Sequence, residues 1–216
     1  MTNSMTRSLA LVLSSGAWLL VACGPKEKQA AGGESAPAAA APAAPPAAQV
    51  AVFDSTLELL GVRFHVASAT EGSVGRLTIT PSGLEIDNSP MTQEIDGTVT
   101  GAEVADLNVD QSPEVYVYVR SAGADARGSV VAYGANRKKS LSRIYLPPVT
   151  ENAEAAKGYR GHDEFAVVEN TFAQRFPVYT DTSATATPAG GTRQLQYKLK
   201  QGEAGWVLKL DKVLDY

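Results

Sequence analysis

Cysteine and histidine are scarce in this chain of 216 residues, and their scarcity excludes several classes of protein. Cys23 is the one cysteine, so the chain cannot be a disulfide scaffold. Two histidines, His65 and His162, cannot supply the clusters that zinc sites use. The sequence also has no HExxH, GxSxG or SxxK motif and no glycine-rich phosphate loop. Zinc proteases, α/β-hydrolases, β-lactamase-like enzymes and P-loop proteins therefore lack their required groups.

Positive charge is also in short supply. Lysine and arginine number 19 against 23 acidic residues, which gives a formal net charge of −4 and a pI near 5.3. A surface that binds phosphates needs a basic excess, so the composition argues against a nucleic-acid partner. The one compact basic run is NRKK, residues 136–139, which we interpret as a solvated turn.

The N-terminal segment has the order of a bacterial lipoprotein signal. Arg7 supplies a positive charge, residues 8–18 are largely apolar, and LLVAC ends at Cys23. The apolar stretch is short for a transmembrane helix. LLVAC resembles the lipobox, which implies a lipidated Cys23 and removal of residues 1–22. The alternative is an ordinary secretory signal with an incidental cysteine.

The expected location is the periplasm, with a membrane contact through the N-terminal lipid. Gly24 follows Cys23 in place of aspartate, and this resembles lipoproteins that are sorted to the outer membrane. Residues 23–49 are rich in alanine and proline, with repeated APAA units. Such a composition buries no apolar surface, so we expect a semi-extended linker of about 3 Å per residue. The folded domain is then expected at residues 50–216.

Period-two patterns dominate this domain, which predicts an all-β fold. In VYVYV, the valines 115, 117 and 119 alternate with Tyr116 and Tyr118, as in a strand that is covered on both faces. The runs RQLQYKLK and GWVLKL form a predicted hairpin around QGEAG. Eight to ten short strands favour an antiparallel β-sandwich, which follows the signal and the linker. An edge strand could also pair two copies into a homodimer.

Two loops carry candidate binding residues. SAGADARG, residues 121–128, separates two strongly β-forming runs and offers small residues with hydrogen-bond donors. Its candidates are Ser121, Gly123, Ala124, Asp125, Arg127 and Gly128. GYRGHDEF contributes Tyr159, Arg160 and His162. Tyrosine and arginine commonly anchor interfaces. Each loop could equally be a plain structural connection.

Carboxyl groups suggest two further kinds of site, an acid–base pair and a calcium loop. Asp163 and Glu164 are adjacent, and adjacent residues on a strand point apart, which disfavours acid–base catalysis. In DLNVDQSPE, the residues Asp106, Asn108, Asp110 and Ser112 alternate like the start of a calcium loop. Gln111 replaces the glycine that a calcium loop requires, so we favour ordinary turn chemistry and expect no metal and no cofactor.

Several long motifs together resemble one family. They are VADLNVDQSPEVYVYVRSAG, IYLPP, GYRGHDEFAVVEN, RFPVY and GGTRQLQYKL, in this order, across residues 51–216. The domain resembles the bacterial periplasmic inhibitors of invertebrate-type (I-type) lysozyme. The resemblance implies a β-sandwich without enzymatic activity, which blocks the lysozyme active-site cleft with the loop after VYVYVR and so protects peptidoglycan.

One feature departs from the family pattern. The family brings a serine and a tyrosine from this loop into the cleft, whereas residues 121–128 contain no tyrosine and Arg127 takes its place. Two alternatives to inhibition stay open. One is a calcium- or glycan-binding surface module that uses DLNVDQSPE, and the other is an envelope structural or assembly protein.

Overall fold

The computed structural model describes residues 51–71, 73–181, 187–188, 190–203 and 205–216. The expected signal peptide, lipidated Cys23 and linker lie outside these residues and stay predictions. Among the residues described, no helix is both long and apolar enough to cross a membrane.

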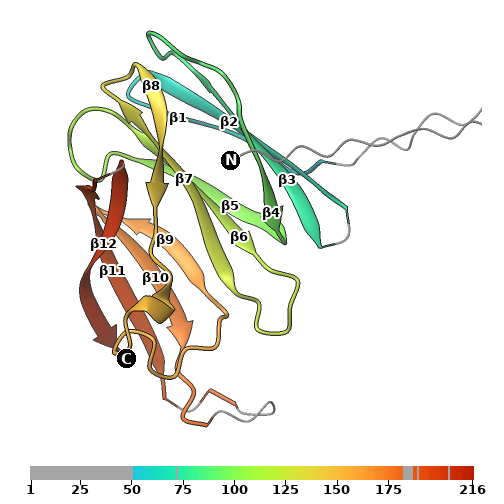
Figure 1. Cartoon of the computed structure of the whole chain (residues 1–216), viewed down its shortest axis with the longest axis vertical. Helices are drawn as coiled ribbons and strands as arrows, with labels where there is room; N and C mark the ends of the chain where they lie inside the picture. The colour runs from blue at the N-terminus through green and yellow to red at the C-terminus, as the bar shows by residue number, and fades with distance from the viewer. Residues whose placement is uncertain (1–50, 72, 182–186, 189, 204) are drawn as a thin grey trace, which may run out of the picture. The chain divides into compact units, whose positions relative to one another are not determined.

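The described residues form twelve strands and one short 3-10 helix, which confirms the all-β prediction. The strands make two sheets (Figure 1). One has the order β1-β2-β3-β4, and the other has the order β5-β6-β7-β8-β12-β11-β10-β9. The elements are β1 Ala51–Leu59, β2 Val62–Glu71, β3 Val74–Ser82, β4 Met91–Asp96, β5 Thr98–Ala105, β6 Glu114–Arg120, β7 Gly128–Asn136, β8 Ser140–Tyr145, η1 Val149–Glu151, β9 Glu164–Val168, β10 Thr171–Pro177, β11 Thr192–Gln201 and β12 Trp206–Asp215.

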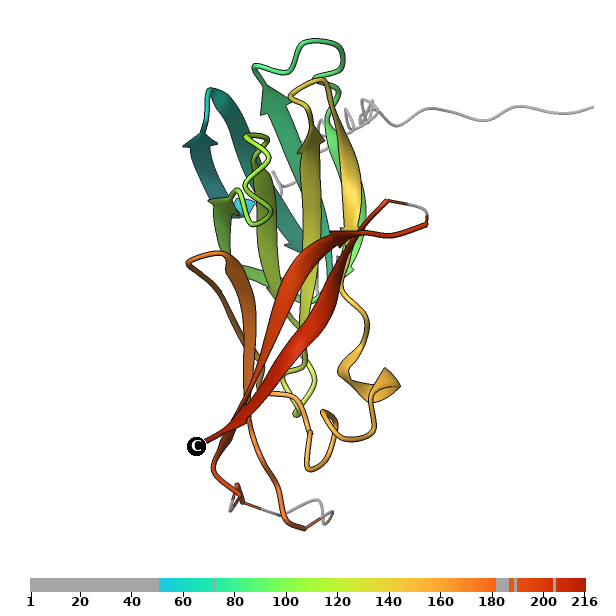
Figure 2. The same cartoon turned by 90° about the vertical axis from the view of Figure 1, so that its left-hand side faces the viewer.

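One strand pair departs from the predicted antiparallel pattern. β8 and β12 pair in parallel, and over only two residue pairs, Trp206 with Ile144 and Val207 with Tyr145. β9 to β12 cross β6 to β8 at an angle rather than continuing alongside them (Figure 2). The two halves of the eight-stranded sheet thereby enclose an apolar core between them. The domain is a sandwich, one sheet of which folds back toward a barrel.

Strand β6 is buried on both faces, as its alternation predicted. Val115, Val117 and Val119 enter the core that the four-stranded sheet covers. Tyr116 and Tyr118 enter the second core, between the halves of the eight-stranded sheet. A fully buried large apolar side chain stabilises a fold by about 1.5–3 kcal/mol. β6 therefore connects both layers and gives the β6–β7 loop a rigid base.

The estimate of eight to ten strands was low because the candidate strands omitted β1 and β4. β4 reads MTQEID, and Ile95 is its one buried side chain. Both strands lie at edges of the four-stranded sheet. Inward and exposed positions alternate in both strands, but Ser55 and Gln93 put polar residues at inward positions, which interrupts the apolar pattern in the sequence.

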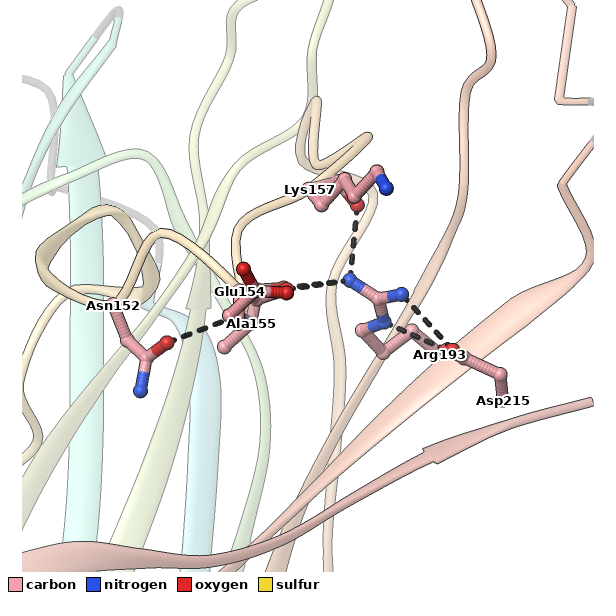
Figure 3. A network of polar contacts seen from close by, with 6 residues as sticks. All are labelled: Asn152, Glu154, Ala155, Lys157, Arg193 and Asp215. Atoms are coloured by element: carbon pink, nitrogen blue, oxygen red, sulfur yellow. Dashed lines mark hydrogen bonds and ion pairs between the residues drawn. The ribbon is translucent and has the colours of Figure 1, made fainter.

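Arg193, at the start of β11, holds the connection between β8 and β9 against the sheet (Figure 3). Its Nη1 donates to the carbonyl oxygens of Glu154, Ala155 and Lys157 at 2.9, 3.3 and 3.1 Å. Its Nε and Nη2 donate to the carboxylate of Asp215 in β12 at 2.6 and 3.0 Å. The residue is only 9% exposed. This connection leads into the second candidate binding loop, so Arg193 fixes the direction from which that loop arrives.

Candidate functional site

The first candidate loop connects β6 and β7 (Figure 1). Its own hydrogen bonds close it. The amide of Ser121 donates to the carbonyl oxygen of Arg127 at 2.9 Å, and the amide of Arg127 donates to Oγ of Ser121 at 3.1 Å. Within the loop that these two hydrogen bonds close, the amide of Ala126 donates to the carbonyl oxygen of Gly123 at 2.9 Å. Residues 122–124, which include Ala124, form the exposed tip. The loop is therefore a narrow protrusion with internal bonding.

The second candidate loop packs against the first, although the two lie far apart in the sequence. The amide of His162 donates to the carbonyl oxygen of Asp125 at 2.8 Å. The guanidinium carbon of Arg127 lies 5.8 Å from the ring centre of Tyr159, within cation–π range. Gly161 has a φ of +93°, and a Cβ there would lie 2.2 Å from the Asp125 oxygen. Only glycine permits this approach of the two backbones.

We call residues 121–128 and 159–162 the paired loops. A buried carboxylate, that of Asp163, fastens them to the sheet. Its Oδ2 accepts from the amide of Gly128 at 2.7 Å and from the hydroxyl of Tyr159 at 2.8 Å. Its Oδ1 accepts from Nε2 of Gln174 at 2.7 Å. Burial, and next the charge of Asp163, raises the pKa of the Tyr159 hydroxyl, which therefore remains a donor.

The side chains of Asp163 and Glu164 differ sharply in exposure, as expected for neighbours that point apart. Asp163 is 4% exposed, whereas Glu164 is exposed. This difference in exposure is unfavourable for joint action of the two groups on one substrate. Asp163 has three hydrogen-bond donors from the protein itself, so its place in the fold is that of a structural anchor.

The paired loops combine small exposed residues at positions 122–124 with cationic and aromatic side chains around them. The Arg127 side chain is 54% exposed, and its Nη2 lies 3.2 Å from Oδ2 of Asp125. The guanidinium carbon of Arg160 lies 5.0 Å from the ring centre of Tyr179, and the exposed ring of His162 stacks on the same tyrosine. An exposed ion pair contributes at most about 1 kcal/mol. Arg127 can therefore exchange Asp125 for a carboxylate of a partner at little cost.

The sequence did not identify Gly161, Asp163 and Gln174 as parts of this site. Gly161 offered the one usable signal, because a glycine between charged or polar residues often marks a positive φ. The sequence gave no signal for Gln174, because a polar residue in a strand usually points to solvent. Its burial depends on Asp163 and on Tyr197, whose hydroxyl donates to its Oε1 at 2.9 Å.

The segment from Asp106 to Glu114 forms the turn that the sequence favoured over a calcium loop. The amide of Asp110 donates to Asp106, the Asn108 side chain donates to Asp110, and the amide of Ser112 donates to Asp110, at 3.0, 3.0 and 2.8 Å. Carboxylate oxygens of Asp106, Asp110 and Glu114 nevertheless lie within 4.8 Å of one another. A cation would have to displace some of these contacts, and calcium binding stays the untested alternative to a plain turn.

Glu114 should make the stability of the domain depend on pH. Burial, together with the charges of Asp106 and Asp110, raises the pKa of its carboxyl group from 4.5 to about 8, although the Leu107 amide opposes this. Between these values the folded chain holds a proton that the unfolded chain has released. The free energy of unfolding should therefore fall as the pH rises through this window, by up to a few kcal/mol at about 1.4 kcal/mol per pKa unit.

Glu114→Gln is expected to flatten this dependence, because the amide does not ionise and its oxygen can still accept from Leu107. Urea unfolding at a series of pH values measures the effect. The control is Glu94→Gln, at an exposed position of β4. Equal pH slopes for Glu114→Gln and the unaltered chain would refute the assignment.

Comparison with known proteins found no matching family model, no matching curated protein and no matching solved structure. The geometry of the paired loops and the resemblance of the sequence motifs are therefore what support a function.

Proposed function

We propose that this chain is a lipid-anchored envelope protein that inhibits I-type lysozyme by inserting the tip of the paired loops into its active-site cleft. The hydrogen bond from the His162 amide to the Asp125 carbonyl oxygen carries the proposal. It joins the two loops into one surface. The sequence had indicated each loop separately as a candidate binding site. The motif resemblance assigns the first of these loops to the cleft.

The chemistry of the first loop suits such a target. A glycosidase cleft contains two carboxyl groups, so a blocking loop has to be narrow and has to present donors. Arg127 presents a half-exposed guanidinium with several N–H groups. The Ser121 oxygen accepts the Arg127 amide, and its hydroxyl hydrogen can still be donated to a partner. The paired loops would then meet both the carboxylates and the rim of the cleft.

We infer that the domain itself is not an enzyme. The Asp163 carboxylate is occupied by internal donors, and the His65 ring lies 3.2 Å from Asp54 on the exposed face of β1 and β2. The purified protein is expected to hydrolyse neither peptidoglycan nor simple glycosides and esters. Turnover that disappears in Asp163→Asn or His162→Ala would contradict this inference.

The direct test is a lytic assay, in which I-type lysozyme acts on bacterial cell walls with and without the protein. Dose-dependent protection of the walls is expected. If the protein protects against no I-type lysozyme, the proposal fails.

Lipidation has a separate test. Cys23→Ala is expected to abolish lipid attachment and signal cleavage, because the thiol is the atom that is alkylated. Membrane fractionation and intact mass distinguish the outcomes. A variant that is still lipidated and anchored, or a cytoplasmic location of the unaltered chain, would contradict the proposed place at the periplasmic side of the outer membrane.

One observation favours the calcium-binding alternative. Carboxylate oxygens of Asp106, Asp110 and Glu114 lie within 4.8 Å of one another. A ligand that binds the folded state alone raises Tm in proportion to the logarithm of its concentration. A calcium titration that raises Tm, and fails to do so in Asp106→Asn, would favour this alternative over a plain turn. Capture of a peptidoglycan or outer-membrane partner would instead favour a structural role in the envelope.

A further inference from the structure

A cavity of about 770 Å³ lies at the end of the β6–β7 hairpin that is remote from the paired loops. It opens between the β7–β8 turn and the tip of the β11–β12 hairpin. Within the described residues, the backbones of these hairpins pair only where Ile144 and Tyr145 lie opposite Trp206 and Val207. Beyond that short parallel junction the two hairpins separate, which leaves the space open. Its volume lies in the range of small-molecule sites, roughly 300–1,000 Å³.

The walls of the cavity combine one aromatic ring with several groups that donate and accept hydrogen bonds. Trp206 lines it together with Asn136, Ser140, Ser142 and Gln201. The indole Nε1 donates to Oδ1 of Asn136 at 3.2 Å, and Oγ of Ser142 bonds the same oxygen at 3.1 Å. These bonds hold the indole ring in place. A sugar matches such a wall, because its C–H face packs on an aromatic ring while its hydroxyls bond to hydroxyl and amide groups.

The charged groups of the wall are Arg137, Lys139 and Asp110. Both cations are exposed. The carboxylate of Asp110 already accepts from the Ser112 amide and the Asn108 side chain. Among the residues that line the cavity, two cations stand against one acid, and on the side of the two cations the cavity favours a ligand with a negative charge. Asp106 and Glu114 lie beside Asp110, so the acidic group of a ligand would have to bind at the side of Arg137 and Lys139.

The turn that carries these cations is fixed in place, so its description as a merely solvated turn was incomplete. Lys138 Nζ donates to the carbonyl oxygen of Leu60 at 2.8 Å. The carbonyl oxygens of Lys138 and Lys139 accept from the amides of Glu85 and Ile86 at 2.8 and 3.0 Å. Lys138, the second basic residue of NRKK, thus ties this turn to the β1–β2 turn, while Arg137 and Lys139 border the cavity.

We propose that this cavity binds a saccharide that carries an acidic group, either a carboxylate or a phosphate. The indole and the hydroxyl and amide groups recognise the sugar, and Arg137 with Lys139 recognises the acidic group. The proposal is independent of lysozyme inhibition, because none of the cavity residues belongs to the paired loops.

Tryptophan fluorescence tests the proposal directly. The chain has two tryptophans, Trp18 and Trp206, so the full chain with Trp18→Phe reports from the cavity alone. Glucuronate presents the carboxylate and glucose 6-phosphate presents the phosphate, while glucose and inorganic phosphate separate the sugar from the charge. We expect a saturable change with at least one acidic sugar and affinities at least about tenfold weaker for glucose and for inorganic phosphate.

The double variant Arg137→Gln with Lys139→Gln is expected to weaken binding of the acidic sugar about tenfold or more. Arg63→Gln with Arg76→Gln removes the same charge from the exposed face of the four-stranded sheet and should leave binding unchanged. Circular dichroism checks that each variant folds. If the cavity variant does not fold, added potassium chloride should still weaken binding to the unaltered cavity, because salt screens exposed charges.

Four outcomes would overturn the proposal. No response to either acidic sugar would leave the cavity without this class of ligand. Equal affinity for glucose, or binding that salt does not weaken, would remove the role of the cations. Equal affinity for inorganic phosphate would show an ion-binding patch without recognition of a sugar.

Discussion

Replacing Arg127 by alanine is expected to weaken inhibition of an I-type lysozyme by at least tenfold. In the proposed complex, Arg127 pairs with a catalytic carboxylate of the lysozyme in a water-poor cleft. Truncation of Arg127 would leave that buried carboxylate without a partner, which costs about 2–5 kcal/mol of binding free energy. Each 1.4 kcal/mol corresponds to about a factor of ten in affinity. The pair with Asp125 at 3.2 Å is exposed and offsets only a small part of this effect.

Ser121→Ala should have a smaller effect, about 1.5–3 kcal/mol, because one hydrogen bond to a charged group is lost. This variant also removes the acceptor of the Arg127 amide, so circular dichroism and urea unfolding have to accompany the lytic assay. Arg63→Ala is the control for charge and should inhibit normally, because Arg63 is exposed and lies beside the β1–β2 turn, which Lys138 ties to the other end of the β6–β7 hairpin. Unchanged inhibition by the Arg127→Ala and Ser121→Ala double variant would place the active surface elsewhere, first of all on residues 159–162.

Gly161→Ala separates the geometry of the paired loops from their side chains. It removes no donor, but its Cβ would meet the Asp125 carbonyl oxygen at 2.2 Å and force the loops apart. Weaker inhibition with a folded domain would show that the target contacts both loops in this arrangement. Full inhibition would show that the first loop acts alone.

The largest loss of stability is expected from Arg193→Ala, about 3 kcal/mol in the free energy of unfolding. The guanidinium is the donor for three carbonyl oxygens of the β8–β9 connection, and a hydrogen bond to a charged group contributes about 1.5–3 kcal/mol. Truncation leaves these acceptors without their donor and removes the ion pair that lowers the pKa of Asp215. The three hydrogen bonds share one Nη1 atom, so their contributions do not simply add.

Urea unfolding measures this loss, with Arg143→Ala at an exposed position of β8 as the control for charge. Arg193→Lys should retain part of the stability, because an ammonium group keeps the charge but lacks the planar fork that serves Asp215 and the carbonyl oxygens together. Hydrogen exchange should speed up at residues 154–160 in both variants. A loss below about 0.5 kcal/mol, the size of an ordinary surface change, would contradict the assigned role.

Local pattern was enough to predict ten of the twelve described strands and both candidate loops. The alternation from Val115 to Val119 required a strand with two covered faces, because successive side chains of a strand point to opposite sides. Both cores now account for that alternation. The hairpin around residues 201–205 followed for the same reason, with Leu199 opposite Leu208. Polar turn residues placed the two candidate loops between strands, as the structure has them.

The sequence by itself determined the all-β class, the central strand and the identity of both loops, since these depend on neighbours a few residues apart. Tertiary structure alone decided that Asp125 meets His162, that Asp163 is buried and that Arg193 binds the β8–β9 connection. The cavity beside Trp206 likewise exists only because β8 and β12 pair over two residue pairs and then separate. Each of these contacts joins distant segments of the chain, and their approach depends on how the eight-stranded sheet folds back on itself, for which local periodicity carries no signal.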